Sequence, residues 1–479
     1  YFQQELGILR ASIVGNNEDL QDAIDDVEPE TVFPFTYDIG SPGQETEHGL
    51  LKADLALFLG EHIFNLQYAI QRNIRREYDV RRGDLNERPV IDLELLSHTI
   101  DTEWIQPTKG RWNGSSGIQL FTQNSTNDPE SNPANFVPDY DVLNIGAFTV
   151  QSLEFNKTIL EFGARLDFQS LSVADTIRDT FIYSNEIDFA NPTFTLGIRK
   201  NVSDELTWFS NIGTAWRPPN VAELYSFGLH QSRLQFGFWR YDFNPEITTP
   251  VDSVFDQSLR TVPVEQGIKL VAGVEVKKKR LTAEFIGYAN RINNYIFLRP
   301  YGVTTNIRGP DFPFFIFDQT DALFLGTDWD IRYAHTPTVL SEIKISYVYA
   351  QSVERNQPLL EIPPLNIDYT FGHEIGNWYY GVNVSYTAEQ WNAPLVIEPL
   401  EIGEENVAAD RNTDIFDFME VPNSYFLLGT EVGYNRKHWN VEIKVNNLLN
   451  TSYRINTDRL RYFANAPGRN ISFSLQYSF

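Results

Sequence analysis

Apolar and polar residues alternate along much of this chain, and the pattern is clearest in its last ten residues, 470–479. Small polar residues occupy one face of this segment, and the other face carries Ile471, Phe473, Leu475, Tyr477 and Phe479. A period of two predicts a β-strand with one apolar and one polar face. Such a strand fits a soluble sandwich, where the apolar face meets a second sheet, or a membrane barrel, where it meets lipid.

Similar segments recur upstream, and together they predict about eighteen strands. We place them at 3–14, 49–58, 61–71, 91–105, 111–121, 141–154, 157–171, 191–200, 205–215, 264–276, 281–298, 321–335, 341–351, 365–373, 377–388, 423–434, 438–449 and 470–479.

The connections between these segments alternate in length. Short turns are expected near Gly60, Asn156 and Gly376, whereas long connections are expected at 15–48, 216–263, 299–320 and 389–422. Greek-key sandwiches do not sort their connections in this way, but a membrane barrel has short turns at one rim and long loops at the other. The chain is therefore predicted to be all-β, a transmembrane antiparallel up-and-down β-barrel.

Individual segments indicate which face meets lipid. In 377–388, the aromatic residues Trp378, Tyr380 and Tyr386 bracket an aliphatic centre, as expected of side chains at the two membrane interfaces. In 438–449, Glu442 and Lys444 alternate with apolar residues and are expected to point into a polar lumen, where charges pair across strands. Aromatic residues make up 14% of the chain, which an aromatic-rich carbohydrate-binding β-protein would also explain.

Composition excludes several functions. No run of eighteen apolar residues occurs, so a transmembrane helix is not expected. Cysteine is absent, which excludes disulfides, thiolate metal sites and a cysteine nucleophile. The net charge of −26 argues against nucleic acid as a partner. No nucleophile elbow, His-Glu-x-x-His motif or phosphate-binding glycine loop is present, so we do not expect an enzyme.

Two expected loops are strongly acidic. Segment 15–48 has ten acidic residues and no Lys or Arg, and segment 389–422 adds Glu398, Glu401, Asp414 and others. One interpretation is a funnel that concentrates cations or metal complexes. The other is ordinary solvated charge, including divalent ions bound near lipopolysaccharide, and this is the more common case.

The segment 211–231, NIGTAWRPPNVAELYSFGLHQ, carries an Arg-Pro pair followed by Glu-Leu-Tyr: Arg217, Pro218, Glu223, Leu224 and Tyr225. The C-terminal segment has a matching series of motif residues at Asn447, Asn450, Pro467, Gly468, Arg469 and the terminal aromatic Phe479. In this order and at these places, the motifs closely resemble those of TonB-dependent outer-membrane receptors over about the last three quarters of the chain. A Pro-Gly turn and an Asn-rich cap also fit the ends of strands physically.

The resemblance implies more than this chain contains. Such receptors have twenty-two strands, preceded by a plug domain and an energy-coupling box near the N-terminus, and they lie in the outer membrane of Gram-negative bacteria. We expect residues 1–479 to form the C-terminal part of the barrel, with the signal peptide, plug and first strands on residues outside this sequence. The TonB complex would then act through the plug.

The resemblance also implies energy-coupled uptake of a scarce nutrient, a siderophore-type metal chelate or a metal ion, with no resident cofactor. His230 and Glu223 are candidate metal ligands. Tyr225, Phe236 and Trp239 are candidates for stacking on an aromatic chelate, and Arg454 and Arg461 for holding an anionic one. Each has a plainer interpretation: a hydrogen-bonded histidine at the rim, aromatic packing, or arginines paired with acidic loops.

Two other functions stay open. A complete eighteen-stranded passive porin would conduct without energy. A structural barrel subunit would use its long loops to dock a surface lipoprotein, in addition to its contacts with outer-membrane lipid and lipopolysaccharide.

Overall fold

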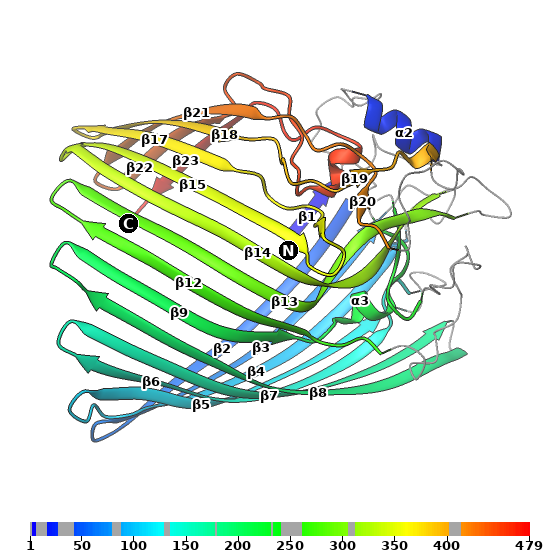
Figure 1. The fold of residues 1–479 in the computed structure, drawn as a ribbon, viewed down its shortest axis with the longest axis horizontal. Coiled ribbons are helices and arrows are strands. Elements are labelled where there is room, and N and C mark those ends of the chain that lie inside the picture. The colour runs from blue at the N-terminus through cyan, green and yellow to red at the C-terminus, as the bar shows by residue number, and fades with distance from the viewer. Residues whose placement is uncertain are drawn as a thin grey trace.

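The computed structural model describes residues 2–5, 17–26, 43–78, 88–128, 135–177, 180–230, 233–240, 261–304, 312–401 and 413–479. Its main feature is a single curved sheet (Figure 1). The seventeen long strands of the described residues are β2 Gly43–Leu59, β3 His62–Tyr78, β4 Ile91–Ile105, β5 Trp112–Asn127, β6 Asp139–Phe155, β7 Thr158–Ile177, β8 Thr180–Asn201, β9 Leu206–Arg217, β12 Glu265–Lys277, β13 Leu281–Thr304, β14 Phe312–Thr336, β15 Val339–Ser352, β17 Asn366–Ile375, β18 Trp378–Thr387, β21 Tyr425–Arg436, β22 Trp439–Asn446 and β23 Asn470–Tyr477.

Short elements lie among these strands and at one rim. The short strands are β1 Phe2–Glu5, β10 Phe227–His230, β11 Arg233–Phe236, β16 Gln357–Pro358, β19 Leu395–Val396 and β20 Phe416–Asp417. The helices are α2 Asn17–Asp25, α3 Val221–Tyr225, and the 3₁₀ turns η2 Pro399–Glu401 and η3 Arg459–Tyr462. No helix in the described ranges has the length and hydropathy needed to cross a membrane.

Each long strand pairs with the next one along the chain in antiparallel register, from β2 to β23. The predicted up-and-down topology is confirmed. The tight turns lie together at one end and the long connections at the other (Figure 1). We call these ends the short-turn rim and the long-loop rim.

The eighteen predicted segments match these seventeen strands and β1, but several strands extend beyond their predicted ends. β7 and β8 run to Ile177 and from Thr180, and β13 and β14 run to Thr304 and from Phe312. Most of the predicted long connection 299–320 is therefore paired strand. The alternation that marks a wall between lipid and lumen weakens there, although the aromatic and β-branched run Phe314–Phe317 still favours extended backbone.

Side chains alternate across the wall as predicted. Apolar residues on the outward face remain exposed in the isolated chain; Leu166, Phe194 and Leu196 are 58–59% exposed. On the inward face, Lys444 lies opposite Glu431 in the strand register, and Arg332 forms an ion pair with Glu342 at 2.7 Å. Pairing of inward charges across strands is thus observed for Arg332 and Glu342, while Lys444 is placed opposite an acid in the register. The outward apolar band is the surface that meets lipid.

The sheet has two edges within the described residues. β1 covers only the end of β2, pairing Phe2 with Thr46 and Glu5 with Gly43, so residues 47–59 of β2 have a partner on one side alone. On the other edge, β23 pairs only with β22. The predicted strand 3–14 continues into residues 6–14, which lie outside the described residues.

Candidate functional site

The motif after β9 folds into a compact turn that an ionic network holds. The Asn220 side chain accepts from the Glu223 backbone N–H at 2.9 Å, and the Glu223 carboxylate accepts from the Asn220 N–H at 2.7 Å, forming a capping box for α3. Arg217 donates to both carboxylate oxygens of Glu223 at 2.8 and 2.9 Å. Glu223 therefore already holds a helix end and a guanidinium.

The same arginine joins two strands. Its Nε donates to Glu265 at 2.7 Å, and the other oxygen of Glu265 accepts from the Ile296 N–H at 2.6 Å. The end of β9, the start of β12 and an inner position of β13 are thereby tied to α3. This explains why an Arg-Pro and a Glu-Leu-Tyr sequence stand at this spacing: the arginine must reach a carboxylate on the helix and another on the neighbouring strand.

The predicted stacking residues lie in the protein interior. Tyr225, Phe236 and Trp239 are only 1–5% exposed, and the rings of Tyr225 and Trp239 pack edge to face with centroids 5.2 Å apart. The Tyr225 hydroxyl accepts from Asn185 at 2.9 Å. In this conformation the three rings form packed clusters with residues of β7, β13 and β14 and do not line the cavity described below.

The structure places the backbone of His230 at the end of β10, but its side chain lies outside the described residues. Among the described residues, no group of three or more His, Cys, Asp or Glu side chains is arranged to hold a metal ion. The proposed pair of His230 and Glu223 as metal ligands stays a prediction.

Gly237 offers a direct test of the packing around this motif. A Cβ added there would lie 2.5 Å from the Leu224 carbonyl carbon and from the Tyr225 nitrogen, both backbone atoms. Because backbone cannot move aside cheaply, Gly237→Ala is expected to destabilise the protein by about 1–3 kcal/mol. The loss would appear in the midpoint of urea unfolding of the barrel in detergent. Gly287→Ala is the control, since nothing lies within 4 Å of its added Cβ; equal stability of the two variants would contradict the expectation.

The C-terminal motif also has a structural role. Asn447 and Asn450 adopt left-handed φ angles of 49° and 56°. The Asn447 side chain bonds both the N–H and the carbonyl of Thr451 at 2.8 Å, and the Asn450 side chain accepts from the Arg469 N–H at 2.8 Å. This last hydrogen bond joins Asn450, near the start of the loop between β22 and β23, to Arg469 at the end of that loop. This arrangement confirms that the Asn-rich segment caps backbone groups where β22 ends.

Between these ends, the loop builds a cap over the long-loop rim. Its hydrophobic core brings together residues from α2, β13, β14, β20, η3 and the segment after β19: Leu20, Leu298, Phe315, Ile397, Phe416, Phe418, Tyr462 and Phe463. We call this cluster and the segments that carry it the cap. Helix α2 was not predicted, although Leu20, Ala23 and Ile24 follow a helical period and face this core.

A buried polar triad fixes the cap. Asp417 accepts hydrogen bonds from Arg461 and from the Tyr462 hydroxyl, and Arg461 also donates to the Asn456 carbonyl at 3.2 Å. Burial disfavours the charge of Arg461, but attraction to Asp417 outweighs it and raises its pKa. Burial, and then the Asp417 charge, raises the pKa of Tyr462 well above its ordinary value, so the phenol stays a donor. With 2% exposure, Arg461 is part of the cap core.

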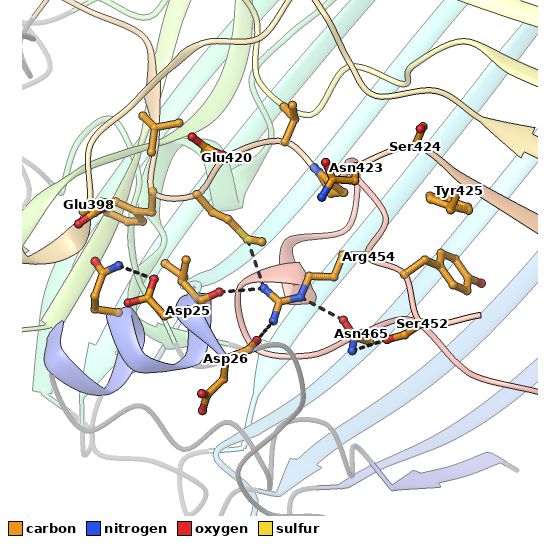
Figure 2. Close-up of a pocket in the computed structure, with 18 of the residues that line it drawn as sticks. Asp25, Asp26, Glu398, Glu420, Asn423, Ser424, Tyr425, Ser452, Arg454 and Asn465 are labelled. Carbon is orange, nitrogen blue, oxygen red and sulfur yellow. Dashed lines mark hydrogen bonds between the residues drawn. The ribbon is translucent and has the colours of Figure 1, made fainter. Parts of the chain in front are cut away.

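Arg454 borders a cavity of about 690 Å³ that is lined by α2, by the loop segments around it and by Tyr425 at the start of β21 (Figure 2). Its guanidinium donates to the carbonyls of Ile24 and Asp26 at 3.3 and 2.5 Å, which end helix α2, and to Asn465 at 3.2 Å. A cation suits the C-terminus of a helix, where carbonyls lack partners. The other polar residues at the cavity include Asp25, Asp26, Glu398, Glu401, Glu420, Asn423, Ser424 and Tyr425.

The structure therefore brings together only part of the predicted site. Arg454 lies at the cavity, whereas Glu223, Tyr225, Phe236, Trp239 and Arg461 lie in packed or ionic contacts away from it. Asp25, Asp26, Glu398 and Glu401 belong to the two loops whose acidity the sequence made conspicuous. Glu420 and Gln21 were not predicted as site residues. Nothing in the local sequence shows that the segment at Glu420 lies at the same cavity as helix α2.

An apolar outward face, a charged inward face and two dissimilar rims define a transmembrane β-barrel wall. The chain belongs to the TonB-dependent receptor family: the family model described as "TonB dependent receptor-like, beta-barrel" matches residues 28–448. TonB-dependent receptor barrels are outer-membrane proteins of Gram-negative bacteria, and the family is one of receptors and transporters.

Solved structures with the same fold support this assignment. The copper transporter OprC aligns with a TM-score of 0.67 at 16% identity, over 92% of this chain and 66% of its own. The FrpB iron transporter from Neisseria meningitidis, in its apoprotein form, aligns at 0.64 and 12%, over 92% and 65%. The unliganded ferric citrate transporter FecA aligns at 0.63 and 14%, over 91% and 62%. At these identities the likeness shows the fold, and the chain spans a little less than two thirds of each.

A search of curated proteins found no match to the sequence.

Proposed function

We propose that this barrel belongs to a receptor for energy-coupled uptake of a scarce nutrient, a siderophore-type metal chelate or a metal ion. The observation that carries the proposal is the cavity that α2 and the neighbouring loop segments line at the long-loop rim. Its volume of about 690 Å³ lies within the range of small-molecule sites in proteins. The structural neighbours are transporters of copper, iron and ferric citrate, and this supports metal uptake as the class of function.

The complete receptor contains more than residues 1–479 in this proposal. Thirteen residues of β2, at 47–59, and the eight residues of β23 each have a free backbone edge among the described residues, and such edges normally pair with another strand or are covered. We propose that further strands of the same protein close the wall between them and that a plug domain fills the polar lumen and contacts the TonB complex. The outward apolar face would meet lipid and lipopolysaccharide, and the cap would carry any contact with a surface lipoprotein.

Uptake measurements test this function. The complete protein is produced in a Gram-negative host that lacks its own metal receptors, and accumulation of radiolabelled iron or copper chelates is followed. Accumulation is expected to require TonB and to stop when a protonophore discharges the inner membrane. Uptake that continues without TonB or an energised membrane would instead identify a passive porin and contradict the proposal.

A further inference from the structure

The barrel wall has a step at its long-loop end, between β15 and β18. Strand β17 begins at Asn366, opposite Ser346, whereas β15 continues to Ser352. Residues 347–352 therefore extend beyond β17, and the short strand β16 pairs with only the last two of them. Backbone groups at such an edge need partners from another part of the chain or from water.

The chain that follows β18 lies across this step. The Ala388 N–H donates to the backbone carbonyl just before β17 at 2.9 Å, and the Gln390 side chain donates to two carbonyls of the loop between β16 and β17, both at 3.1 Å. The Asn392 side chain donates to the Ala350 carbonyl of β15 at 3.0 Å. Residues 388–392, which we call the crossing segment, thus run from β18 past the start of β17 to β15 and are held along their length.

The crossing segment holds one large aromatic side chain at the surface. Gln390 is 4% exposed, whereas its neighbour Trp391 is 62% exposed. The Trp391 indole N–H donates to the Tyr347 hydroxyl at 3.1 Å, and the two rings stack with their centroids 5.2 Å apart. An indole has a single donor, and here that donor is paired, so the exposed remainder of the ring is apolar surface.

The face of the wall on which Trp391 lies follows from the strand register. Val382 and its partner Phe371 are on the lipid-facing side of the wall. Phe371 pairs with Ser341 of β15, and alternation places Tyr347, six residues further on, on the same side. Since Trp391 stacks on Tyr347, it extends the outward apolar band at the long-loop end, which in such barrels is the outer boundary of the membrane.

We propose that Trp391 inserts into the outer leaflet of the membrane, at the boundary between headgroups and acyl chains, and anchors the crossing segment there. Tryptophan favours this boundary because its ring is apolar while its N–H is polar. Residues 390–397 carry no charged side chain, although 21% of the whole chain is charged, so no charge in this stretch opposes contact with lipid. Lipid is the occupant that fits, because the exposed ring is continuous with the lipid-facing band.

The anchor is also connected to the cap. Ile397, six residues after Trp391, belongs to the core of the cap, and its N–H donates to the Asp417 carbonyl at 2.9 Å. Insertion of Trp391 into the membrane would therefore fix the position of this side of the cap relative to the bilayer. This role does not depend on what the barrel transports.

Fluorescence quenching tests the inference. The complete protein and its Trp391→Phe variant are reconstituted in phosphatidylcholine vesicles, and their difference spectrum gives the emission of Trp391. This emission is expected to lose most of its intensity when the acyl chains carry bromine near the headgroup end, and to change little when iodide is added to the water. Phenylalanine keeps a ring on Tyr347, and heat-modifiable migration on gels shows that the variant is folded.

Trp239→Phe is the matched control, because Trp239 is 5% exposed and packs in the cluster around α3. Its difference spectrum is expected to respond to neither quencher. A second variant, Trp391→Cys, gives an independent measurement, since residues 1–479 contain no other cysteine. A bimane label on it is expected to be quenched by nitroxide-bearing lipid, whereas the same label on Leu400→Cys, at a 49% exposed position of η2, is expected to be quenched by iodide.

Two results would overturn the inference. Quenching at position 391 by iodide and not by the modified lipids would place the side chain in water. Protection from both quenchers would place it in a contact with protein, either a second copy of this chain or a partner at the cell surface. Both results are independent of the uptake assay.

Discussion

Replacing Asp417 by Ala is expected to open the cap while leaving the barrel wall folded. The change removes the acceptor for Arg461 and Tyr462, so the buried Arg461 guanidinium loses the carboxylate with which it is paired. Breaking a buried ion pair from one side typically costs about 3–5 kcal/mol. The core around Phe416 and Phe418 should loosen, and protease added to intact cells should cut the long loops much faster than in the unmodified protein.

Two variants separate this mechanism from a general effect of substitution. Glu398→Ala changes an exposed acid on the neighbouring segment and is expected to leave the cleavage rate unchanged. The double change Asp417→Leu with Arg461→Met replaces the pair by apolar side chains and should recover much of the lost protection. Protection in Asp417→Ala equal to that of the unmodified protein would show that the triad does not hold the cap.

A single charge introduced on the outward face is expected to destabilise the barrel, whereas the same charge on the inward face is expected to be tolerated. Val382 is 40% exposed, lies at the middle of β18 and faces lipid, with Phe371 and Thr430 opposite it on the neighbouring strands. Arginine at the midplane of a barrel's lipid face costs about 2–4 kcal/mol. Val382→Arg should therefore shift the urea midpoint for folding into lipid vesicles and reduce the folded fraction on gels.

Ser385→Arg is the matched control, because it lies on the same strand with its side chain in the polar lumen. Its expected effect on the urea midpoint is small. If both arginines were tolerated equally, or if the lumenal one were the more damaging, the assignment of faces to lipid and lumen would be wrong.

The wall could be predicted because the property that marks it is local. Residues 378–387 show their lipid and lumen faces in ten consecutive positions, and every neighbouring strand repeats the pattern. The strand extensions of β13 and β14 beyond the membrane could not be predicted, since residues such as Phe314 and Phe315 are buried by the cap and the hairpin of β10 and β11 rather than by lipid. In these extensions neither face of the strand meets a uniform lipid or lumen environment, so apolar and polar residues do not alternate regularly.

The candidate site shows the same limit. Tyr225 and Trp239 were candidates for stacking on a ligand, with aromatic packing as the plainer interpretation. Nothing local in the sequence shows that the chain at Gly237 packs against Leu224 and Tyr225 and that the two rings meet edge to face. Arg217 was recognised as a motif residue, while its two carboxylate partners were visible only in the fold. Asp25 and Asp26 were noticed for their charge alone. Their proximity to Arg454 could not be predicted, because Arg454 and helix α2 are more than 400 residues apart in the sequence.

The contact between Arg454 and helix α2 also sets the order in which the parts of the protein assemble. The Arg454 guanidinium and the Ile24 carbonyl are separated by 430 residues, so they can meet only after the intervening strands have brought the two ends of the chain near one another. Closing so long a loop costs entropy that the contact alone does not recover. Helix α2 should therefore dock last. The cavity that it lines would then form only after the whole wall has been inserted.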